Sequence, residues 1–266
     1  MKLEIISKFP SKAQKNSPPI LFIHGAWHAV WCWDVNFLDY FTNQGFEVHA
    51  ISLRGHGKSE GWEKLRWTRV ADYVADLQRT IQEMERVPIL VGHSMGGLVV
   101  QKYLENASVP GAVLLAPVPI DGVLKTALKF LRRHPLLFAK MNLTLSLQPF
   151  ISTNELIRDA FFSKSISQEQ LIQYAKNLQD ESYLGFLDML VFALPKPEKV
   201  KTPVLILGAE KDNIFSANQI RKTAEAYNTK EEIIPDMAHD MMVEPGWQAV
   251  ADKIINWLHE QKLATS

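Results

Sequence analysis

The motif Gly-His-Ser-Met-Gly at residues 92–96 places a serine between two glycines, and this arrangement can support nucleophilic chemistry. An apolar, strand-like run precedes the motif and a helix-like run follows it, as a nucleophile elbow requires. A side chain at either glycine position would collide as the chain reverses, so the serine hydroxyl stands exposed on a strained turn. The following helix offers free N–H groups to developing negative charge. The motif therefore predicts Ser94 as a nucleophile.

A serine becomes nucleophilic at neutral pH when a base takes its proton and an acid orients that base. The elbow predicts the chain order serine, acid, histidine. Asp212 comes just after the apolar run 204–208, and His239 follows the run 231–234, so both should lie at the sheet edge that carries Ser94. We therefore predict that these three residues form a catalytic triad.

Other acidic residues compete for the role of the triad acid. Glu210 is two residues closer to the strand end, and Asp121 follows the preceding strand, so both stay alternatives. Asp236 and Asp240 lie in the loop of the predicted base, where we expect them to bond local backbone. The other seven histidines do not directly follow the last predicted strand, where the base of the triad is expected.

A tetrahedral intermediate also needs two N–H donors aimed at its oxygen. One should be the N–H of Met95, directly after the nucleophile. The sequence His-Gly-Ala-Trp at 24–27 ends another strand-like run, and its glycine allows close approach. We predict the N–H of Ala26 as the second donor, with that of Trp27 as the alternative.

Three tryptophans cluster beside this loop. Trp27 is predicted as an aromatic wall for the substrate, with core packing as the open alternative. We expect Trp31 and Trp33 to pack in the core, and Cys32 to be a small core residue.

These residues need a sheet that brings several strand ends together. Apolar runs alternate with helix-like patterns, which predicts an α/β fold with a mostly parallel central sheet flanked by helices. The predicted strands are 3–9, 20–23, 47–52, 89–91, 112–115, 204–207 and 231–234, and the clearest helices run from about 68 to before Pro88 and over 247–257.

One connection is much longer than a crossover requires, because 87 residues separate Pro117 from the strand that begins after Pro203, both ends counted. Its apolar, helix-like middle predicts an inserted helical cap, residues 118–197, on a core made of 1–117 and 198–266. We expect the apolar run 124–150 to overhang the nucleophile. The alternative is a set of ordinary core helices.

Composition excludes several classes of function. The chain has 29 basic residues (Lys and Arg) and 29 acidic residues (Asp and Glu). It therefore lacks the excess of basic residues that is typical of nucleic-acid-binding proteins. The single cysteine allows no intrachain disulfide, and Glu4 interrupts any signal-peptide core, so we expect a cytoplasmic protein. No apolar run is long enough to span a membrane. Neither metal-ligand spacing nor a phosphate loop occurs, and we expect no cofactor.

The chain resembles the α/β-hydrolase fold superfamily, in particular its serine esterases and lipases. The matching pieces are His24-Gly25-Ala26, Arg54–Ser59, the motif at 92–97, Asp212 and His239. The segment 24–33 is similar to the oxyanion segment of methylesterases and hydroxynitrile lyases. The resemblance implies an eight-stranded sheet with a cap and the same triad, and Arg54–Ser59 as a structural turn.

Together these features predict a serine hydrolase that cleaves carboxylic esters through an acyl-enzyme on Ser94. Small to medium apolar esters are the expected small-molecule substrates. A lysophospholipase- or thioesterase-like lipid hydrolase, a cofactor-free lyase and a ligand receptor with the same triad stay alternatives. The sequence does not indicate an oligomeric state.

Overall fold

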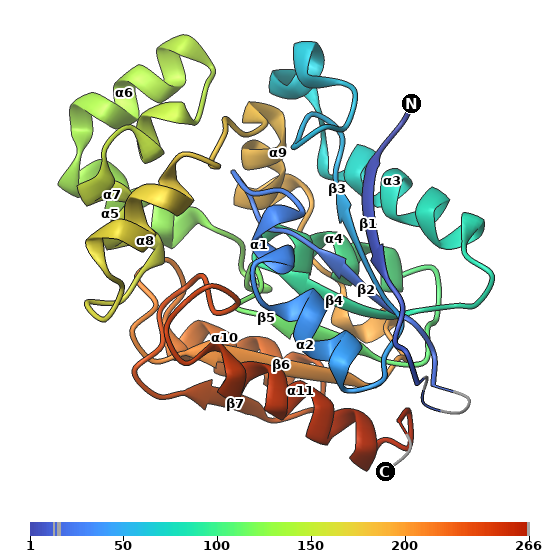
Figure 1. Cartoon of the computed structure of the whole chain (residues 1–266). Helices are drawn as coiled ribbons and strands as arrows, with labels where there is room; N and C mark the ends of the chain where they lie inside the picture. Colours follow the sequence, from blue (N-terminus) through green and yellow to red (C-terminus); the bar gives the residue numbers. More distant parts are fainter. Residues whose placement is uncertain (13, 15–16, 265–266) are drawn as a thin grey trace.

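In the computed structural model, which describes residues 1–12, 14 and 17–264, a twisted sheet is covered by helices on both faces (Figure 1). The sheet order is β1-β3-β2-β4-β5-β6-β7. β1 is antiparallel to β3, and every other pair is parallel. The strands are β1 (Glu4–Lys8), β2 (Ile20–Ile23), β3 (Val48–Ser52), β4 (Ile89–His93), β5 (Ala112–Leu115), β6 (Val204–Ala209) and β7 (Glu231–Ile234).

The expected alternation of strands and helices is confirmed, but the eight-stranded sheet implied by the resemblance is wrong for the described residues. Seven strands form. An N-terminal hairpin would need two strands before β2, and the described chain there supplies only β1. β1 pairs directly with β3 at the edge of the sheet.

Alternate residues of the central strands serve two separate cores, because successive side chains of a strand point to opposite faces. In β2, Ile20 and Phe22 belong to one buried cluster, while Leu21 and Ile23 belong to the other. The first cluster includes residues of α1 (Trp31–Asp34), α2 (Phe37–Asn43) and α11 (Trp247–Glu260). The second includes residues of α3 (Val70–Glu83), α4 (Met95–Leu104) and α10 (Ala217–Ala226). Both faces of the parallel sheet are therefore buried, which explains its continuous apolar strands.

The residues flanking the predicted oxyanion loop pack as expected. Trp33 is fully buried and lies 5.0 Å from Phe22, ring centroid to ring centroid. Trp31 is partly buried and stacks on Tyr174 at 5.9 Å. Cys32 is a buried free thiol.

Five helices occupy the long connection between β5 and β6. They are α5 (Leu124–Arg133), α6 (Pro135–Thr144), α7 (Asn154–Phe161), α8 (Gln168–Ala175) and α9 (Tyr183–Leu187), and the short helical turns of the chain are η1 (Trp62–Trp67), η2 (Gln148–Ile151), η3 (Asp188–Phe192) and η4 (Pro197–Lys199). In Figure 1, α5 to α8 lie together to one side of the sheet, and α9 lies between them and η1. Among the described residues, no helix combines the length and apolar character needed to cross a bilayer.

Candidate active site

The turn between β4 and α4 has the steric features predicted for it. Ser94 has φ 51° and ψ −114°, a strained backbone conformation for a residue with a side chain. A Cβ on Gly92 would lie 2.6 Å from the carbonyl oxygen of Gly96, and one on Gly96 would lie 2.4 Å from that of His24. Both positions therefore require glycine, and the turn holds the serine at the carboxyl end of β4.

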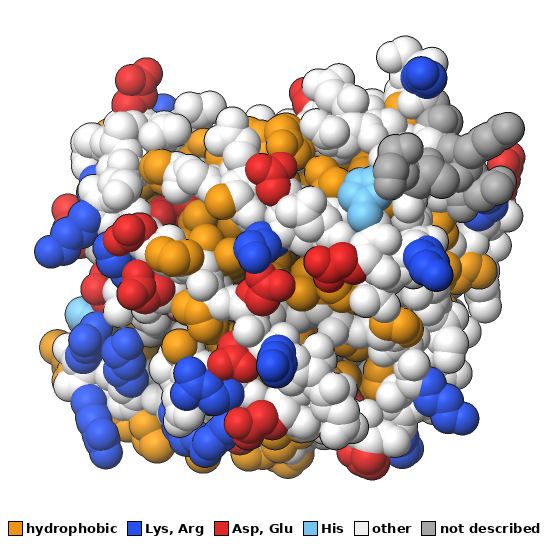
Figure 2. Space-filling model, turned by 90° about the horizontal axis from the view of Figure 1, so that it is seen from below, with side chains coloured by type: hydrophobic (Ala, Val, Ile, Leu, Met, Phe, Trp, Pro, Cys, Tyr) orange, Lys and Arg blue, Asp and Glu red, His pale blue; other side chains and the backbone are white. Residues whose placement is uncertain are grey.

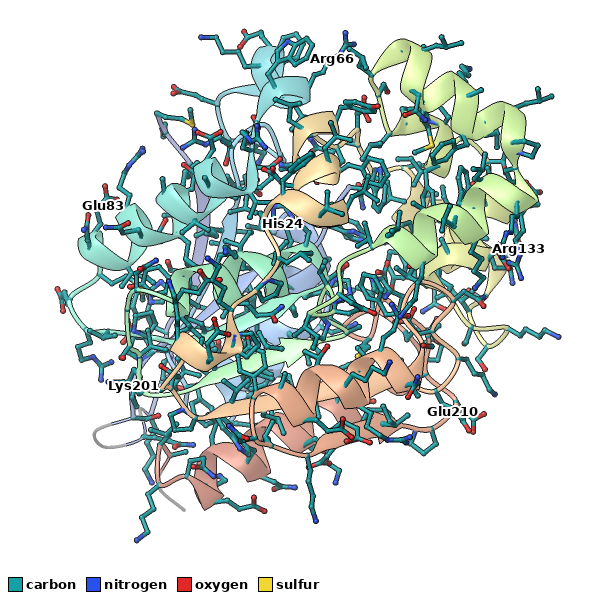
Figure 3. The ribbon with its side chains drawn as sticks, turned by 180° about the vertical axis from the view of Figure 1, so that it is seen from behind. His24, Arg66, Glu83, Arg133, Lys201 and Glu210 are labelled. Atoms are coloured by element: carbon teal, nitrogen blue, oxygen red, sulfur yellow. The ribbon has the colours of Figure 1, made fainter. Side chains whose placement is uncertain are left out.

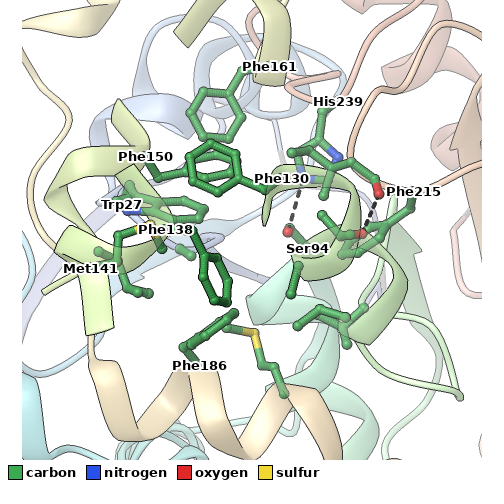
Figure 4. A pocket seen from close by; sticks show the side chains of 18 residues that line it. Trp27, Ser94, Phe130, Phe138, Met141, Phe150, Phe161, Phe186, Phe215 and His239 are labelled. Carbon is green, nitrogen blue, oxygen red and sulfur yellow. Dashed lines mark hydrogen bonds between the residues drawn. The ribbon is translucent and has the colours of Figure 1, made fainter. Parts of the chain in front are cut away.

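The three predicted triad residues come together in one chain of hydrogen bonds. The hydroxyl of Ser94 donates to Nε2 of His239 at 3.0 Å (Figure 4). Nδ1 of His239 donates to Oδ2 of Asp212 at 2.8 Å. The second carboxylate oxygen of Asp212 accepts the N–H groups of Ile214 and Phe215, at 2.7 and 2.9 Å, so its own loop fixes its orientation.

The competing acidic residues lie outside this chain of bonds. Glu210 accepts the N–H of Asp236, and Asp236 itself pairs with Lys211. Asp121 pairs with Lys125 at the start of α5. In the described structure, Asp212 is thus the carboxylate bonded to the ring of the predicted base.

The segment after β2 approaches the nucleophile closely. A Cβ on Gly25 would lie 3.0 Å from the Cβ of Ser94 and 2.7 Å from Nδ1 of His93, so only glycine fits here. The carbonyl of Gly25 accepts hydrogen bonds from Nδ1 of His24 at 2.8 Å and from the N–H of His28 at 3.3 Å. Because C=O and N–H point in opposite directions across a trans peptide, these bonds fix the direction of the Ala26 N–H.

The two predicted N–H donors are free of other bonds. Within the described chain, neither the N–H of Ala26 nor that of Met95 donates to another protein group. The alternative donor, the N–H of Trp27, is already committed, because it donates to Oε2 of Glu181 at 3.3 Å. This contact favours Ala26 over Trp27 as the second donor.

An apolar pocket opens onto Ser94 and His239, and Figure 4 shows most of its aromatic side chains gathered on one side of the serine, with Phe215 on the other. The space between its walls is about 620 Å³ when the open solvent at its mouth is included. Trp27 forms part of its wall and stacks on Phe150, with ring centroids 4.9 Å apart. Its lining consists of Ala26, Trp27, Ser94, Val118, Val123, Thr126, Ala127, Phe130, Phe138, Met141, Leu147, Phe150, Phe161, Phe186, Met189, Ile214, Phe215 and His239.

The expectation that the run 124–150 overhangs Ser94 is therefore only partly right. Phe130, Phe138 and Met141 line the pocket, but Leu136 and Leu143 point to solvent, each 85% exposed.

Comparison with known proteins agrees with this geometry. The sequence model of the family "serine aminopeptidase, S33" matches residues 14–246, most of the chain. The chain belongs to this family of α/β hydrolases. A monoacylglycerol lipase of Mycolicibacterium smegmatis is 23% identical over 241 residues, covering 82% of this chain and 80% of the lipase. A non-heme chloroperoxidase of Burkholderia pyrrocinia is 32% identical over 117 residues, but this match spans only 39% of that protein and 40% of this chain.

Solved structures show the same fold. The crystal structure of a Paleococcus ferrophilus monoacylglycerol lipase superposes with a TM-score of 0.73, at 22% identity, and the match covers 98% of this chain and all of the lipase chain.

In this α/β hydrolase, two buried ion pairs that sequence reasoning missed flank the loop 25–28. The first joins Glu181, just before α9, to His56 of the turn 54–59, with Oε2 and Nε2 3.0 Å apart. Nδ1 of His56 donates to the carbonyl of Arg54, so both ring nitrogens face acceptors. Burial alone would lower the pKa of His56, but Glu181 raises it above its usual value; the imidazolium in turn holds the pKa of Glu181 below its usual value despite burial.

The second pair shows that the expectation of local backbone bonds is wrong for Asp240, as it is for Asp236, whose carboxylate pairs with Lys211. The Oδ2 of Asp240 accepts a hydrogen bond from Nε2 of His28 at 2.9 Å, and both side chains are buried. Nδ1 of His28 donates to the carbonyl of Ala26 at 2.8 Å. Burial opposes both charges, yet the pair raises the pKa of His28 and lowers that of Asp240. The peptide between Ala26 and Trp27 is thus held on its oxygen by His28 and on its N–H by Glu181.

Two other buried histidines of this α/β hydrolase are neutral. His24 accepts the N–H of Leu53 at Nε2, and burial followed by the charge of His56 lowers its pKa well below the usual value. Nε2 of His93 donates to the carbonyl of His239 at 3.0 Å and so holds the backbone of that residue. Burial, reinforced by His239, lowers the pKa of His93 to about 3.

His93, His239 and Asp240 have possible metal-ligand atoms within 4.8 Å of one another. A metal bound to them would have to take a ring nitrogen of His239 from its bond with Ser94 or with Asp212. The donor set therefore fits the hydrogen-bonded relay better than a metal centre.

Proposed function

We propose that this protein is a serine hydrolase that cleaves apolar carboxylic esters through an acyl-enzyme on Ser94. The observation that supports it best is the unbroken relay from Ser94 through His239 to Asp212, placed at the base of an apolar pocket. A relay of this kind activates a hydroxyl for attack on a carbonyl carbon, and the pocket can bury the hydrocarbon part of an ester.

The geometry suggests the following sequence of steps. The Oγ of Ser94 attacks the carbonyl carbon while its proton passes to Nε2 of His239, and Asp212 stabilises the resulting imidazolium. The N–H groups of Ala26 and Met95 hold the oxyanion. The C–O bond to the alcohol then breaks, and the alcohol leaves with the proton from His239. Water, deprotonated by His239, finally attacks the acyl group, and the acid and free serine are released.

The lining of the pocket favours esters over peptides, although the family takes its name from an aminopeptidase. An aminopeptidase must bind the substrate's terminal ammonium group, normally with a carboxylate, and none of the lining residues is acidic. Apolar and aromatic side chains instead suit an acyl chain. The chain is similar to monoacylglycerol lipases, whose name gives lipid esters as their substrates, and this similarity supports the same substrate class.

We also propose that residues 118–197 act as a cap on a core formed by 1–117 and 198–266. Cap side chains, among them Phe130, Phe138, Met141 and Phe150, supply much of the pocket, whereas Ser94 and His239 come from the core. The cap would then set the chain-length preference, and Trp27 would contact the substrate where core and cap meet.

The proposal is tested by hydrolysis of p-nitrophenyl esters with acyl chains from acetate to dodecanoate. We expect kcat/KM to rise with chain length, by about fourfold for each buried methylene, until the chain outgrows the pocket. Comparable peptide p-nitroanilides should be cleaved far more slowly. Absence of ester hydrolysis by the folded protein would contradict the proposal.

A further inference from the structure

The charges of this neutral chain are distributed unevenly. From Gly122 to Asn154 the sequence holds five lysines or arginines and no Asp or Glu. Since the whole chain has 29 of each kind, the remainder carries 24 basic and 29 acidic residues. This acid-free segment contains α5 and α6, two of the helices that line the pocket.

Both helices have an inner apolar face that lines the pocket and an outer face that is partly exposed to solvent. From α5, Ala127 and Phe130 face inward. The outer face of α5 carries leucines that are almost half exposed, and that of α6 carries leucines that are 85% exposed. These four residues are Leu124 (46%), Leu128 (44%), Leu136 and Leu143. Exposing them costs free energy in water, which a partner would recover by burying them.

The cations lie among these leucines. Arg132 and Lys140 are exposed, and neither forms an ion pair with another described residue. Lys125 and Arg133 pair with Asp121 and Asp159, but these pairs are solvent-exposed and so hold little energy. Figure 2 shows Lys and Arg side chains gathered with hydrophobic ones at its lower left, in a view from below in which α6, at the top of Figure 1, lies on the far side.

We propose that this outer face of α5 and α6 docks on an anionic lipid surface. We call it the cap face, and it consists of Leu124, Leu128, Leu136 and Leu143 together with Lys125, Lys129, Arg132, Arg133 and Lys140. Leucines that project among cations suit a lipid interface, where the leucines enter the acyl region and the long basic side chains reach the headgroups. A second copy of the chain fits poorly, because two such faces would bring like charges together.

The inference deepens the proposed function and rests on it in one respect, the source of the ester. The helices that would touch the lipid also line the pocket through Phe130, Phe138 and Met141. Docking of the cap face would therefore bring the helices that wall the pocket against the lipid surface.

Cosedimentation of the full chain with vesicles tests the docking. The Ser94→Ala variant is used so that no hydrolysis occurs, with vesicles of phosphatidylcholine alone and of phosphatidylcholine mixed with phosphatidylglycerol. We expect clearly tighter binding to the anionic vesicles, weakened by salt because the headgroup attraction is screened. Equal binding to both kinds of vesicle, or no binding to either, would overturn the proposal. Salt-insensitive self-association of the protein without vesicle binding would also overturn it.

Variants locate the contact. Arg132→Gln/Lys140→Gln should weaken binding by about 25-fold, since each cation near an anionic surface is worth about fivefold. The matched control is Lys199→Gln/Lys201→Gln, whose residues come just before β6. Figure 3 shows Lys201 far from Arg133 of the cap face. An equal effect of the control would show general charge attraction and refute the cap face.

The docking and the proposed function can fail separately. Turnover of monodisperse p-nitrophenyl butyrate by Arg132→Gln/Lys140→Gln should equal that of the wild type, because neither residue lines the pocket. Loss of vesicle binding with intact turnover would support docking as a separate property. Turnover without any vesicle binding in the wild type would refute only the docking.

Discussion

Replacing Glu181 by Gln removes one charge from a buried cluster and nearly preserves its shape. Glu181 accepts four hydrogen bonds, from His56, Tyr73, Ser182 and Trp27, at 3.0, 2.7, 2.6 and 3.3 Å. A glutamine has one acceptor oxygen and one NH₂ group. Two of the donors, the ring of His56 and the N–H of Trp27, bond the same oxygen, Oε2, so an NH₂ group at that position leaves both unpaired.

The cost should depend on pH. Near pH 6 His56 is an imidazolium, and breaking a buried pair costs about 3–5 kcal/mol of unfolding free energy. A histidine whose pKa is raised in the folded state gives stability that is complete below its unfolded pKa and is lost as the pH rises through the folded pKa. The wild type thus loses this contribution in alkaline solution, and the cost of the variant should shrink to about 1–3 kcal/mol, the price of the unpaired N–H of Trp27.

Urea unfolding of wild type and Glu181→Gln at several pH values between 6 and 10 measures this difference. Tyr73→Phe is the control, because it removes one hydrogen bond to Glu181 and leaves the ion pair, for about 1 kcal/mol at every pH. In the folded variant we also expect kcat to fall about tenfold with little change in KM, since the loop that carries Ala26 loses one of its anchors. An unchanged midpoint at pH 6, or a cost that does not vary with pH, would refute the reasoning.

Three further outcomes follow from the structure. The pKa of His93 is about 3 in the folded protein and near 6.5 in the unfolded chain, so only the unfolded state binds a proton at this residue as the pH falls from 6.5 to 5. Over this range the free energy of unfolding of the wild type should fall by about 2 kcal/mol more than that of His93→Gln, as measured by urea unfolding. Asp212→Asn should lower kcat by about 10³-fold or more, whereas Glu210→Gln should leave it nearly unchanged, and equal losses in ester assays would reopen the choice of acid. Phe138→Ala should flatten the chain-length profile of kcat/KM, while Leu136→Ala, exposed to solvent, should leave the profile and the thermal midpoint unchanged; identical profiles would contradict the pocket wall.

The parts of the site that the sequence predicts are those fixed by local geometry. The elbow at Ser94 is defined by two glycines whose Cβ atoms would overlap backbone, so its spacing alone identifies it. Asp212 and His239 follow recognisable strands, and parallel strands bring their carboxyl ends to one edge.

The supporting contacts could not be read in the same way. Glu181 and His56 are 125 residues apart, and no local spacing links them. Asp240 pairs with His28, 212 residues away, although its neighbours suggested a local role. Such pairs depend on how segments far apart in the sequence pack against one another, and only the tertiary structure supplies that information.

The long connection between β5 and β6 shows a second limit. α6 carries apolar residues around its whole circumference, so the helical period cannot tell Phe138, which lines the pocket, from Leu136, which is exposed. The missing N-terminal hairpin is a third limit, because the strand count came from a resemblance and not from the residues before β2.

The most direct test of the central claim is mass spectrometry of the protein after reaction with an alkyl fluorophosphonate. A serine activated by this relay should form one stoichiometric phosphonyl adduct, located on the peptide that contains Ser94. His239→Ala should slow the labelling by several orders of magnitude, because the serine then lacks its base. An adduct on another residue, or labelling that is equally fast without His239, would contradict the account.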